Sequence, residues 1–218
     1  MKKPAVKQTP LAIALAKEKR PRATPIDVFK LARKRYLQGQ HIGIGELAKA
    51  LDVSRGTVYR WIGSKDLLLD EIFCSLIKPA FEQAVKATPG HGVDHVVGVH
   101  CHFMATILSF PALQKFIQNE KNHAFRILTN TNSAVSKLVV SLTADHLRQQ
   151  VAAGHLRLSA PPEELAEFFI LANQAIIYSN SISGRSPVIE KACALIRMLL
   201  SGQTPASSSG KQRQDEKV

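Results

Sequence analysis

Residues 44–68 read IGELAKALDVSRGTVYRWIGSKDLL, and this stretch decides the fold of the chain's first third. Its apolar spacing predicts a helix over residues 44–51, a second over residues 54–62, and a third that starts after Ser64. Asp52 lies in the intervening turn, where we expect a left-handed backbone that Asp tolerates better than most residues. Two short helices joined in this way form a helix-turn-helix, which lays its second helix in the major groove of DNA.

The charge of the chain is concentrated around this motif. Residues 1–65 contain fifteen Lys or Arg and four Asp or Glu, so they carry +11 of the total net charge of +12. An isoelectric point near 9.8 is typical of proteins that bind nucleic acid or anionic membranes. No apolar run approaches the roughly 20 residues that span a bilayer, and residues 11–16 are shorter than a signal-peptide core of about 7–15 residues. The sequence therefore favours nucleic acid and predicts no membrane association.

The remainder of the chain is predicted to be helical. Thr24 and Pro25 start a helix that Gly39 ends, and Ser64 starts a long helix that ends near residue 87. No segment alternates with a period of two, so the fold class is all-α, with a three-helix head on a larger helical body. Further helices are expected at residues 92–109, 111–128 (or two helices with a break between 119 and 122), 132–153, 162–182 and 187–201. We predict a flexible basic arm at residues 1–21, a helix-turn-helix DNA-binding domain at 22–66, a helical ligand-binding and dimerisation domain at 67–201, and a disordered tail at 202–218.

The three cysteines, Cys74, Cys101 and Cys193, are far apart in the sequence. Their number is odd, and neither a secretory signal nor a zinc-ligand spacing accompanies them. We therefore expect reduced thiols that pack as small apolar side chains, in a cytoplasmic protein.

Two residues near the motif's second helix are locally unfavourable. Gly56 lies inside that helix, where glycine costs about 1 kcal/mol relative to alanine. Lys65 lies in the first turn of the following helix, where the helix dipole disfavours a cation. A DNA phosphate close to both residues would explain them, and Arg55, at the start of the second helix, has the side chain that most often pairs with guanine. The alternative, a helical hairpin with a polar face, explains neither anomaly.

The run LAKALDVSRGTVYRWIGSKDLL at residues 47–68 resembles the DNA-binding signature of TetR/AcrR-type transcriptional regulators. The resemblance covers residues 24–68, and the C-terminal half of the chain is similar to the QsdR branch of that family. Two positions depart from the pattern, because Asp52 stands where the family usually has Gly and Trp61-Ile62 replaces His-Phe. The resemblance implies that DNA is faced by Thr24, Ser54, Arg55, Gly56, Thr57, Tyr59, Arg60, Trp61 and Lys65.

The last two predicted helices are rich in apolar residues. Residues 162–182 are apolar nearly all round after a charged first turn, and residues 188–200 carry an apolar stripe. The resemblance implies that these helices pack with the same two of a second subunit as a four-helix bundle. The alternative is a plain monomer core. The expected dimer interface contains Phe168, Phe169, Ile176, Ala192, Leu195, Ile196 and Leu199.

The body also contains five of the eight histidines, between residues 91 and 123. His91, Asp94 and His95 have an i, i+3, i+4 spacing that can bind a divalent metal, but an ordinary exposed helix start is the simpler reading, and no metal is predicted. We expect a mainly apolar effector pocket, although core histidines that bind no ligand are an alternative. The expected pocket residues are His100, Phe103, Met104, Ile107, Phe125, Asn173, Gln174 and Tyr178.

These features predict a ligand-responsive transcriptional regulator. We expect a homodimeric repressor that a small, mainly apolar effector releases from a palindromic operator in double-stranded DNA, with no cofactor and no catalytic residue. One alternative is an enzyme, metal-dependent or otherwise, that uses residues 91–123, but no nucleophile elbow, phosphate loop or paired carboxylates accompany them. The other is a sequence-neutral architectural DNA binder, which would not need a large apolar body.

Overall fold

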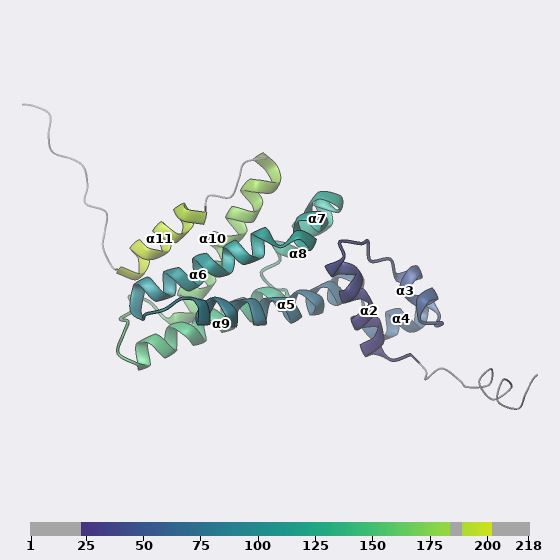
Figure 1. Ribbon diagram of the computed structural model, residues 1–218, viewed down its shortest axis with the longest axis horizontal. Coiled ribbons are helices and arrows are strands. Elements are labelled where there is room, and N and C mark those ends of the chain that lie inside the picture. The colour runs from purple at the N-terminus through teal and green to yellow at the C-terminus, as the bar shows by residue number, and fades with distance from the viewer. Residues whose placement is uncertain (1–22, 184–188, 202–218) are drawn as a thin grey trace, which may run out of the picture. The chain divides into compact units, whose positions relative to one another are not determined.

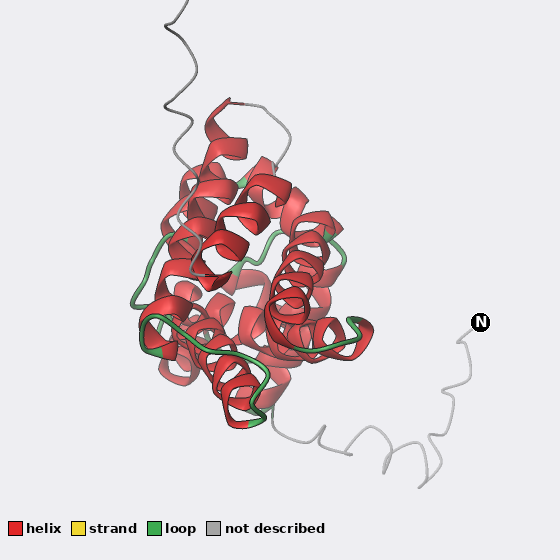
Figure 2. Cartoon of the chain, turned by 90° about the vertical axis from the view of Figure 1, so that its left-hand side faces the viewer, coloured by secondary structure: helices red, strands yellow, loops and turns green. Residues whose placement is uncertain are grey.

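The chain is helical throughout the part that the structure describes. The computed structural model describes residues 23–183 and 189–201, without the side chains of residues 176–183. Within these ranges there are ten helices and no strand (Figure 1), and Figure 2 shows the helices joined only by loops and turns. The all-α prediction is therefore confirmed. The chain divides into two compact units, residues 1–68 and 69–218, and the boundary falls within α5 (Lys65–Ala87).

The first unit holds the predicted helix-turn-helix. Its core includes Val28, Leu47 and Val58, one from each of three short helices, and all three side chains are fully buried. Each of these helices therefore contributes an apolar residue to a common core, which fixes their packing. The three helices are α2 (Pro25–Leu37), α3 (Ile44–Ala50) and α4 (Arg55–Ile62).

The ends of α2 follow from its capping residues. Thr24 Oγ1 accepts a hydrogen bond from the backbone N–H of Asp27 at 3.3 Å, and the Asp27 carboxylate accepts one from the backbone N–H of Thr24 at 2.9 Å. This reciprocal pair is a capping box, and it satisfies two N–H groups at the helix start. Gly39 follows the end of the helix with a φ of 67°, a conformation that favours glycine.

The second unit packs its helices around one apolar core. Val96, Leu147, Phe169 and Ile196, from four different helices, are each at most 3% exposed and belong to this core. The predicted helix at residues 111–128 is two helices, broken at Glu120, which was the stated alternative. The six helices after α5 are α6 (Gly92–Ser109), α7 (Pro111–Asn119), α8 (Lys121–Leu128), α9 (Ala134–Ala152), α10 (Pro162–Ser183) and α11 (Ile189–Ser201).

Two of the cysteines form a disulfide, so the expectation of three reduced thiols was wrong. Cys101 in α6 is bonded to Cys193 in α11, and their Cα atoms are 6.1 Å apart, a separation typical of disulfides. The two residues are 92 positions apart in the sequence, and only the packing of α11 on α6 brings them together. Cys74 is a free thiol. Cysteine usage therefore no longer supports the predicted compartment.

Several expectations lie outside the described residues: the basic arm at residues 1–21, the tail at residues 202–218, and the side chains of Ile176 and Tyr178. No single helix in the described ranges is long and apolar enough to cross a bilayer. The pair α6 and α7 passes the same test of length and composition only when the two are taken together across a bend of 56°.

Candidate functional site

The turn between α3 and α4 sets the start of the second helix of the motif, which we call the recognition helix. Asp52 has a φ of 53°, so the predicted left-handed turn residue is confirmed. Ser54 Oγ accepts a hydrogen bond from the backbone N–H of Thr57 at 3.0 Å, which makes Ser54 the N-cap of α4. The hydroxyl groups of Ser54 and Thr57 are also hydrogen-bonded to each other at 2.9 Å. These contacts place Arg55 at the first position of the helix.

The recognition helix buries Val58 and exposes its opposite face. Arg55, Gly56, Tyr59 and Arg60 are all exposed, and Tyr59 has 49% of its surface accessible. An Arg at the helix start, a Tyr and a second Arg provide one group suited to a base edge and two suited to phosphates. This surface, defined by these four exposed residues, is called the DNA face below.

Among the described residues, none packs on Gly56 closely enough to require glycine there. A Cβ atom at this position would meet only Ser54 Oγ, at 3.8 Å, an ordinary van der Waals contact. Its backbone is not among the left-handed ones of the described residues, so alanine would fit. Gly56 is the second residue of α4 rather than an interior one, so glycine costs the helix less here than the roughly 1 kcal/mol of a helix interior. None of the described residues requires glycine at this position, whereas close approach of another backbone, such as a DNA strand, would require it.

Arg55 rests on the neighbouring helix α3. A Cβ atom at Gly45 would lie 3.0 Å from both Nε and Nη2 of Arg55, so the guanidinium group covers this glycine closely. Glycine at position 45 thus leaves the space in which the exposed Arg55 side chain lies.

The other predicted DNA-facing residues are less exposed or are engaged in local structure. The Thr24 hydroxyl donates to the Asp27 carboxylate at 2.7 Å, and this bond is the main reason that the pKa of Asp27 lies below its usual value. Trp61 and Lys65 are half-buried, and Lys65 is the first residue of α5. Contact of these three residues with DNA stays a prediction, as it does for the other six predicted DNA-facing residues.

The eight predicted effector residues of the body differ in burial. The four that are at most 7% exposed are His100, Phe103, Met104 and Asn173. Ile107 and Gln174 are half-buried, Phe125 is 38% exposed, and Tyr178 has no described side chain. The structure therefore places a subset of the predicted residues in the interior, on α6 and α10.

His100 is the most perturbed group of this subset. Its ring lies edge-on to that of Phe169 with 5.2 Å between centroids. Burial lowers the pKa of His100 to about 4, against a smaller opposing effect of the nearby Asn173 amide. Although the two side chains are close, neither His100 Nε2 nor Asn173 Oδ1 makes a hydrogen bond of good geometry within the described chain.

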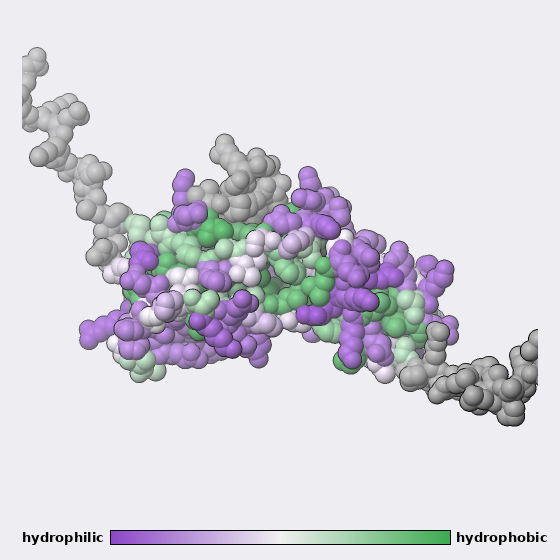
Figure 3. Space-filling model, in the orientation of Figure 1, coloured by the Kyte–Doolittle hydropathy of each residue, from purple (hydrophilic) through white to green (hydrophobic). Residues whose placement is uncertain are grey.

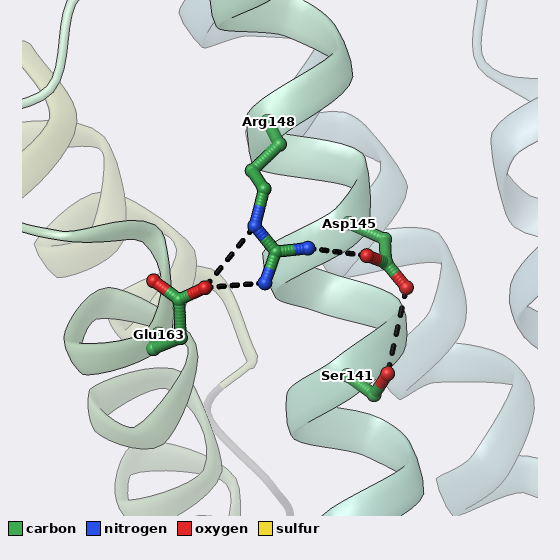
Figure 4. Close-up of polar contacts among 4 residues, drawn as sticks. All are labelled: Ser141, Asp145, Arg148 and Glu163. Carbon is green, nitrogen blue, oxygen red and sulfur yellow. Dashed lines mark hydrogen bonds and ion pairs between the residues drawn. The ribbon is translucent and has the colours of Figure 1, made fainter.

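The structure also contains a groove that the sequence did not indicate. It has a volume of about 660 Å³, lies along α9 and α10, and contains none of the predicted effector residues. At its edge Arg148 of α9 pairs with Glu163 of α10 and with Asp145, and the Arg148 Nε–Glu163 Oε1 distance is 3.1 Å (Figure 4). The lining comes from separate segments of the chain, so no local pattern could have identified it.

The three residues with metal-ligand spacing do not converge. His91 precedes α6, Asp94 pairs with Arg197, and His95 is buried with its ring centroid 5.1 Å from that of His146. In the part of the chain that the structure describes, no three or more His, Cys, Asp or Glu side chains are placed to hold a metal ion.

The predicted dimer residues divide between the chain's own core and its surface. Phe169, Ala192 and Ile196 are at most 6% exposed within the chain itself, and Leu199 is half-buried. These helices, which are apolar on several sides, therefore use one side for the core of the chain, while Phe168 and Leu195 lie on the surface.

Exposed apolar side chains occur together on α10 and α11, two helices that pack on each other. Phe168 and Leu171, three residues apart on α10, are 43% and 55% exposed, and Leu195 and Met198, three residues apart on α11, are 58% and 39% exposed. Figure 3 shows hydrophobic surface over the part of the body where Figure 1 labels α11. Large exposed apolar side chains are typical of interaction surfaces, and one of these four, Leu171, also lines the groove along α9 and α10. Leu171 and Met198 are exposed as well, although they are not among the dimer residues predicted from the sequence.

Comparisons with known proteins identify the architecture. Residues 91–201 match the family model described as "Tetracyclin repressor-like, C-terminal domain". The structure of the R. erythropolis transcriptional repressor QsdR, from the TetR family, has a TM-score of 0.76 and 25% identity, and the match covers 81% of this chain and 94% of QsdR. The regulator FadR from Bacillus subtilis, solved with stearoyl-CoA, shares the fold, with a TM-score of 0.51 and 12% identity over 83% of this chain and 100% of FadR. No curated protein matches the chain. Because the family model spans more than half of the sequence, the chain belongs to the TetR family of transcriptional regulators, where it is related to QsdR.

Proposed function

We propose that the protein is a homodimeric repressor that binds a palindromic operator in double-stranded DNA and leaves it when a small, mainly apolar effector binds the body. The observation that carries the DNA-binding part is Gly56, an exposed glycine in the first turn of α4 with free space for a methyl group. Arg55 would read a base edge, and Tyr59 and Arg60 would contact phosphates. The net charge of +11 over residues 1–65 supports the same conclusion.

A second copy of the chain is the partner that best fits the apolar surface of α10 and α11. Covering Phe168, Leu171, Leu195 and Met198 would remove four large exposed side chains from water. A two-fold dimer presents two recognition helices and therefore fits a palindromic site with two half-sites. Repression is proposed because the similar QsdR is described as a transcriptional repressor. Since the proposed operator is chromosomal DNA, the proposed location of the protein is the cytoplasm.

Effector control requires differential binding. An effector that binds the body more tightly in one conformation shifts the population toward it. In that conformation the two recognition helices would no longer match successive major grooves, so operator affinity would fall. By linkage, the effector lowers operator affinity by the same factor by which the operator lowers effector affinity. The buried His100, Phe103 and Met104 on α6 support an effector site in this region.

Two substitutions on the DNA side test the proposal. With an operator selected from random DNA, Arg55→Ala should cost about 1–3 kcal/mol and relax the sequence preference at one position. Lys65→Ala should weaken binding to all sequences and reduce the salt slope of log K by about one. Fluorescence anisotropy over a salt series measures both effects, and Arg157→Ala, which removes an exposed charge from the body, is the matched control. Unchanged operator binding in both variants would contradict the assignment, and failure to select any preferred sequence would favour the architectural binder.

A further inference from the structure

The disulfide joins α6 to a helix that carries part of the exposed apolar surface. Cys101 lies in the middle of α6, and Cys193 lies near the start of α11, which packs on it (Figure 1). Leu195, which is 58% exposed, follows Cys193 by two residues, or about 200° around the helix. One side of α11 is therefore attached covalently to α6, and the opposite side presents the surface that the proposed dimer would cover.

The other described contacts that hold α11 on the body are limited. Four of its large apolar side chains pack on the core, and only two of them, Ile196 and Leu200, are buried. Arg197 pairs with Asp94 of α6, but these side chains are 49% and 84% exposed, and exposed ion pairs contribute little to stability. An isolated helix of 13 residues is marginal in water, so α11 depends on these contacts and on the disulfide.

The disulfide is unusual for the proposed function. A protein that binds chromosomal DNA works where thiols are kept reduced, and the disulfides that form there are usually transient and either catalytic or redox-sensing. Cys101 is half-buried and Cys193 is 7% exposed, so the sulfur of Cys101 is the more accessible of the two. Exchange with a thiol in solution requires such access.

We propose that the Cys101–Cys193 disulfide is a redox switch that controls dimerisation through α11. The thiolate of a small-molecule thiol attacks Cys101 Sγ, the S–S bond breaks, and Cys193 leaves as a thiolate that takes up a proton. A second small thiol attacks the mixed disulfide and releases Cys101, so two small thiols become their disulfide while both cysteines become thiols. This inference rests on the proposed dimer and its operator binding, and adds their regulation by redox state.

The switch acts by changing how often α11 is docked. In the oxidised chain the covalent bond holds the helix on α6, so its outer side is ready for a partner. In the reduced chain this restraint is lost, and only the subunits with a docked α11 can dimerise. A two-fold dimer needs a docked helix from both subunits, so its apparent dissociation constant rises with the inverse square of the docked fraction. If about one third of the reduced subunits keep α11 docked, the dissociation constant rises about tenfold.

Sedimentation equilibrium of the full chain, with and without dithiothreitol, tests the inference. Reduction should raise the dimer dissociation constant at least about tenfold and lower operator binding in fluorescence anisotropy on the same samples. Cys101→Ser and Cys193→Ser should behave like the reduced chain under both conditions. Cys74→Ser removes the free thiol and is the matched control, which should respond to reduction as the intact chain does. Oxidised dithiothreitol should restore the dimer, and far-ultraviolet circular dichroism should show that the reduced chain stays helical.

Equal dissociation constants for the oxidised and reduced chains overturn the inference, and so does a redox response that persists in Cys101→Ser or is absent from Cys74→Ser. Loss of the helical signal on reduction, or failure to regain the dimer on reoxidation, also overturns it, because the whole body would then have unfolded. The proposed function is tested separately by the oxidised chain. An oxidised dimer that binds its operator and ignores reduction leaves the proposed function intact, whereas an oxidised chain that binds no operator contradicts it.

Discussion

Two buried histidines should make the stability of the body depend on pH. Burial lowers the pKa of His146 to about 4, with the nearby His95 as a second cause, and burial also lowers the pKa of His100 to about 4. The ordinary value, expected in the unfolded chain, is 6.5. The unfolded state therefore binds more protons between these values, and the free energy of unfolding falls as pH decreases through 6.5 toward 4.

The magnitude follows from the size of the pKa shift. Lowering a pKa from 6.5 to about 4 corresponds to about 3 kcal/mol per histidine once the pH is below both values. Between pH 7 and pH 5 the expected loss is about 2 kcal/mol per histidine, or about 4 kcal/mol for both, a large part of the roughly 5–15 kcal/mol of a typical domain. Asp27 and Glu163 have pKa values lowered by Thr24 and Arg148, and the stabilisation from these carboxylates is lost mainly below about pH 4.5.

Urea unfolding followed by circular dichroism at pH 7, 6 and 5 measures this dependence. His146→Gln removes one titrating ring and should reduce the pH dependence by about half, whatever its effect on stability at pH 7. His102→Gln changes an exposed histidine and should leave the dependence unaltered. A free energy of unfolding that stays constant from pH 7 to pH 5 would refute the reasoning, as would an undiminished dependence in His146→Gln.

Three further predictions concern single positions. Gly56→Ala should stabilise the first unit by up to about 1 kcal/mol in urea unfolding, because its methyl group has room. The same substitution should weaken operator binding in anisotropy titrations, and undiminished binding would contradict the proposal that the DNA face contacts DNA. Cys101→Ser should lower the free energy of unfolding by up to about 4–5 kcal/mol by the loop-entropy relation, because the disulfide closes a loop across 92 positions. Reductant should lower the free energy of unfolding of the intact chain and leave that of Cys101→Ser unchanged; an equal effect on both would contradict this prediction. Leu195→Glu should convert a dimer to a monomer in sedimentation, whereas Val151→Glu, also at an exposed apolar position but on α9, should remain dimeric; a dimeric Leu195→Glu would exclude this surface as the interface.

Most of the fold could be predicted because its signals are local. Helix starts depend on caps such as Thr24 and Ser54, whose side-chain oxygens accept hydrogen bonds from backbone N–H groups three residues further on. Gly39 and Asp52 have the left-handed backbones expected at their turns. The DNA face could be predicted for the same reason, because its residues lie on one short helix. Arg55, the first of them, directly follows the Ser54 cap.

The remainder depends on contacts between distant segments. Cys101 and Cys193 meet only because α11 packs on α6. Phe168 and Phe169 are neighbours in a helix that is apolar nearly all round, so periodicity could not decide that Phe169 enters the core while Phe168 is 43% exposed. For the same reason the sequence could propose His100 as an effector residue but could not show that its ring lies beside Phe169 of α10.

The close fit of Arg55 over Gly45 has an evolutionary consequence. A methyl group at position 45 would lie 3.0 Å from the guanidinium nitrogens, tighter than ordinary Cβ contacts, so an alanine there would displace the flexible tip of the arginine. If Arg55 reads a base as proposed, base preference would then change through a residue on α3, while every residue of the recognition helix stayed the same. Descendants of this regulator could acquire new target sites by such indirect steps and keep the helix that binds them intact.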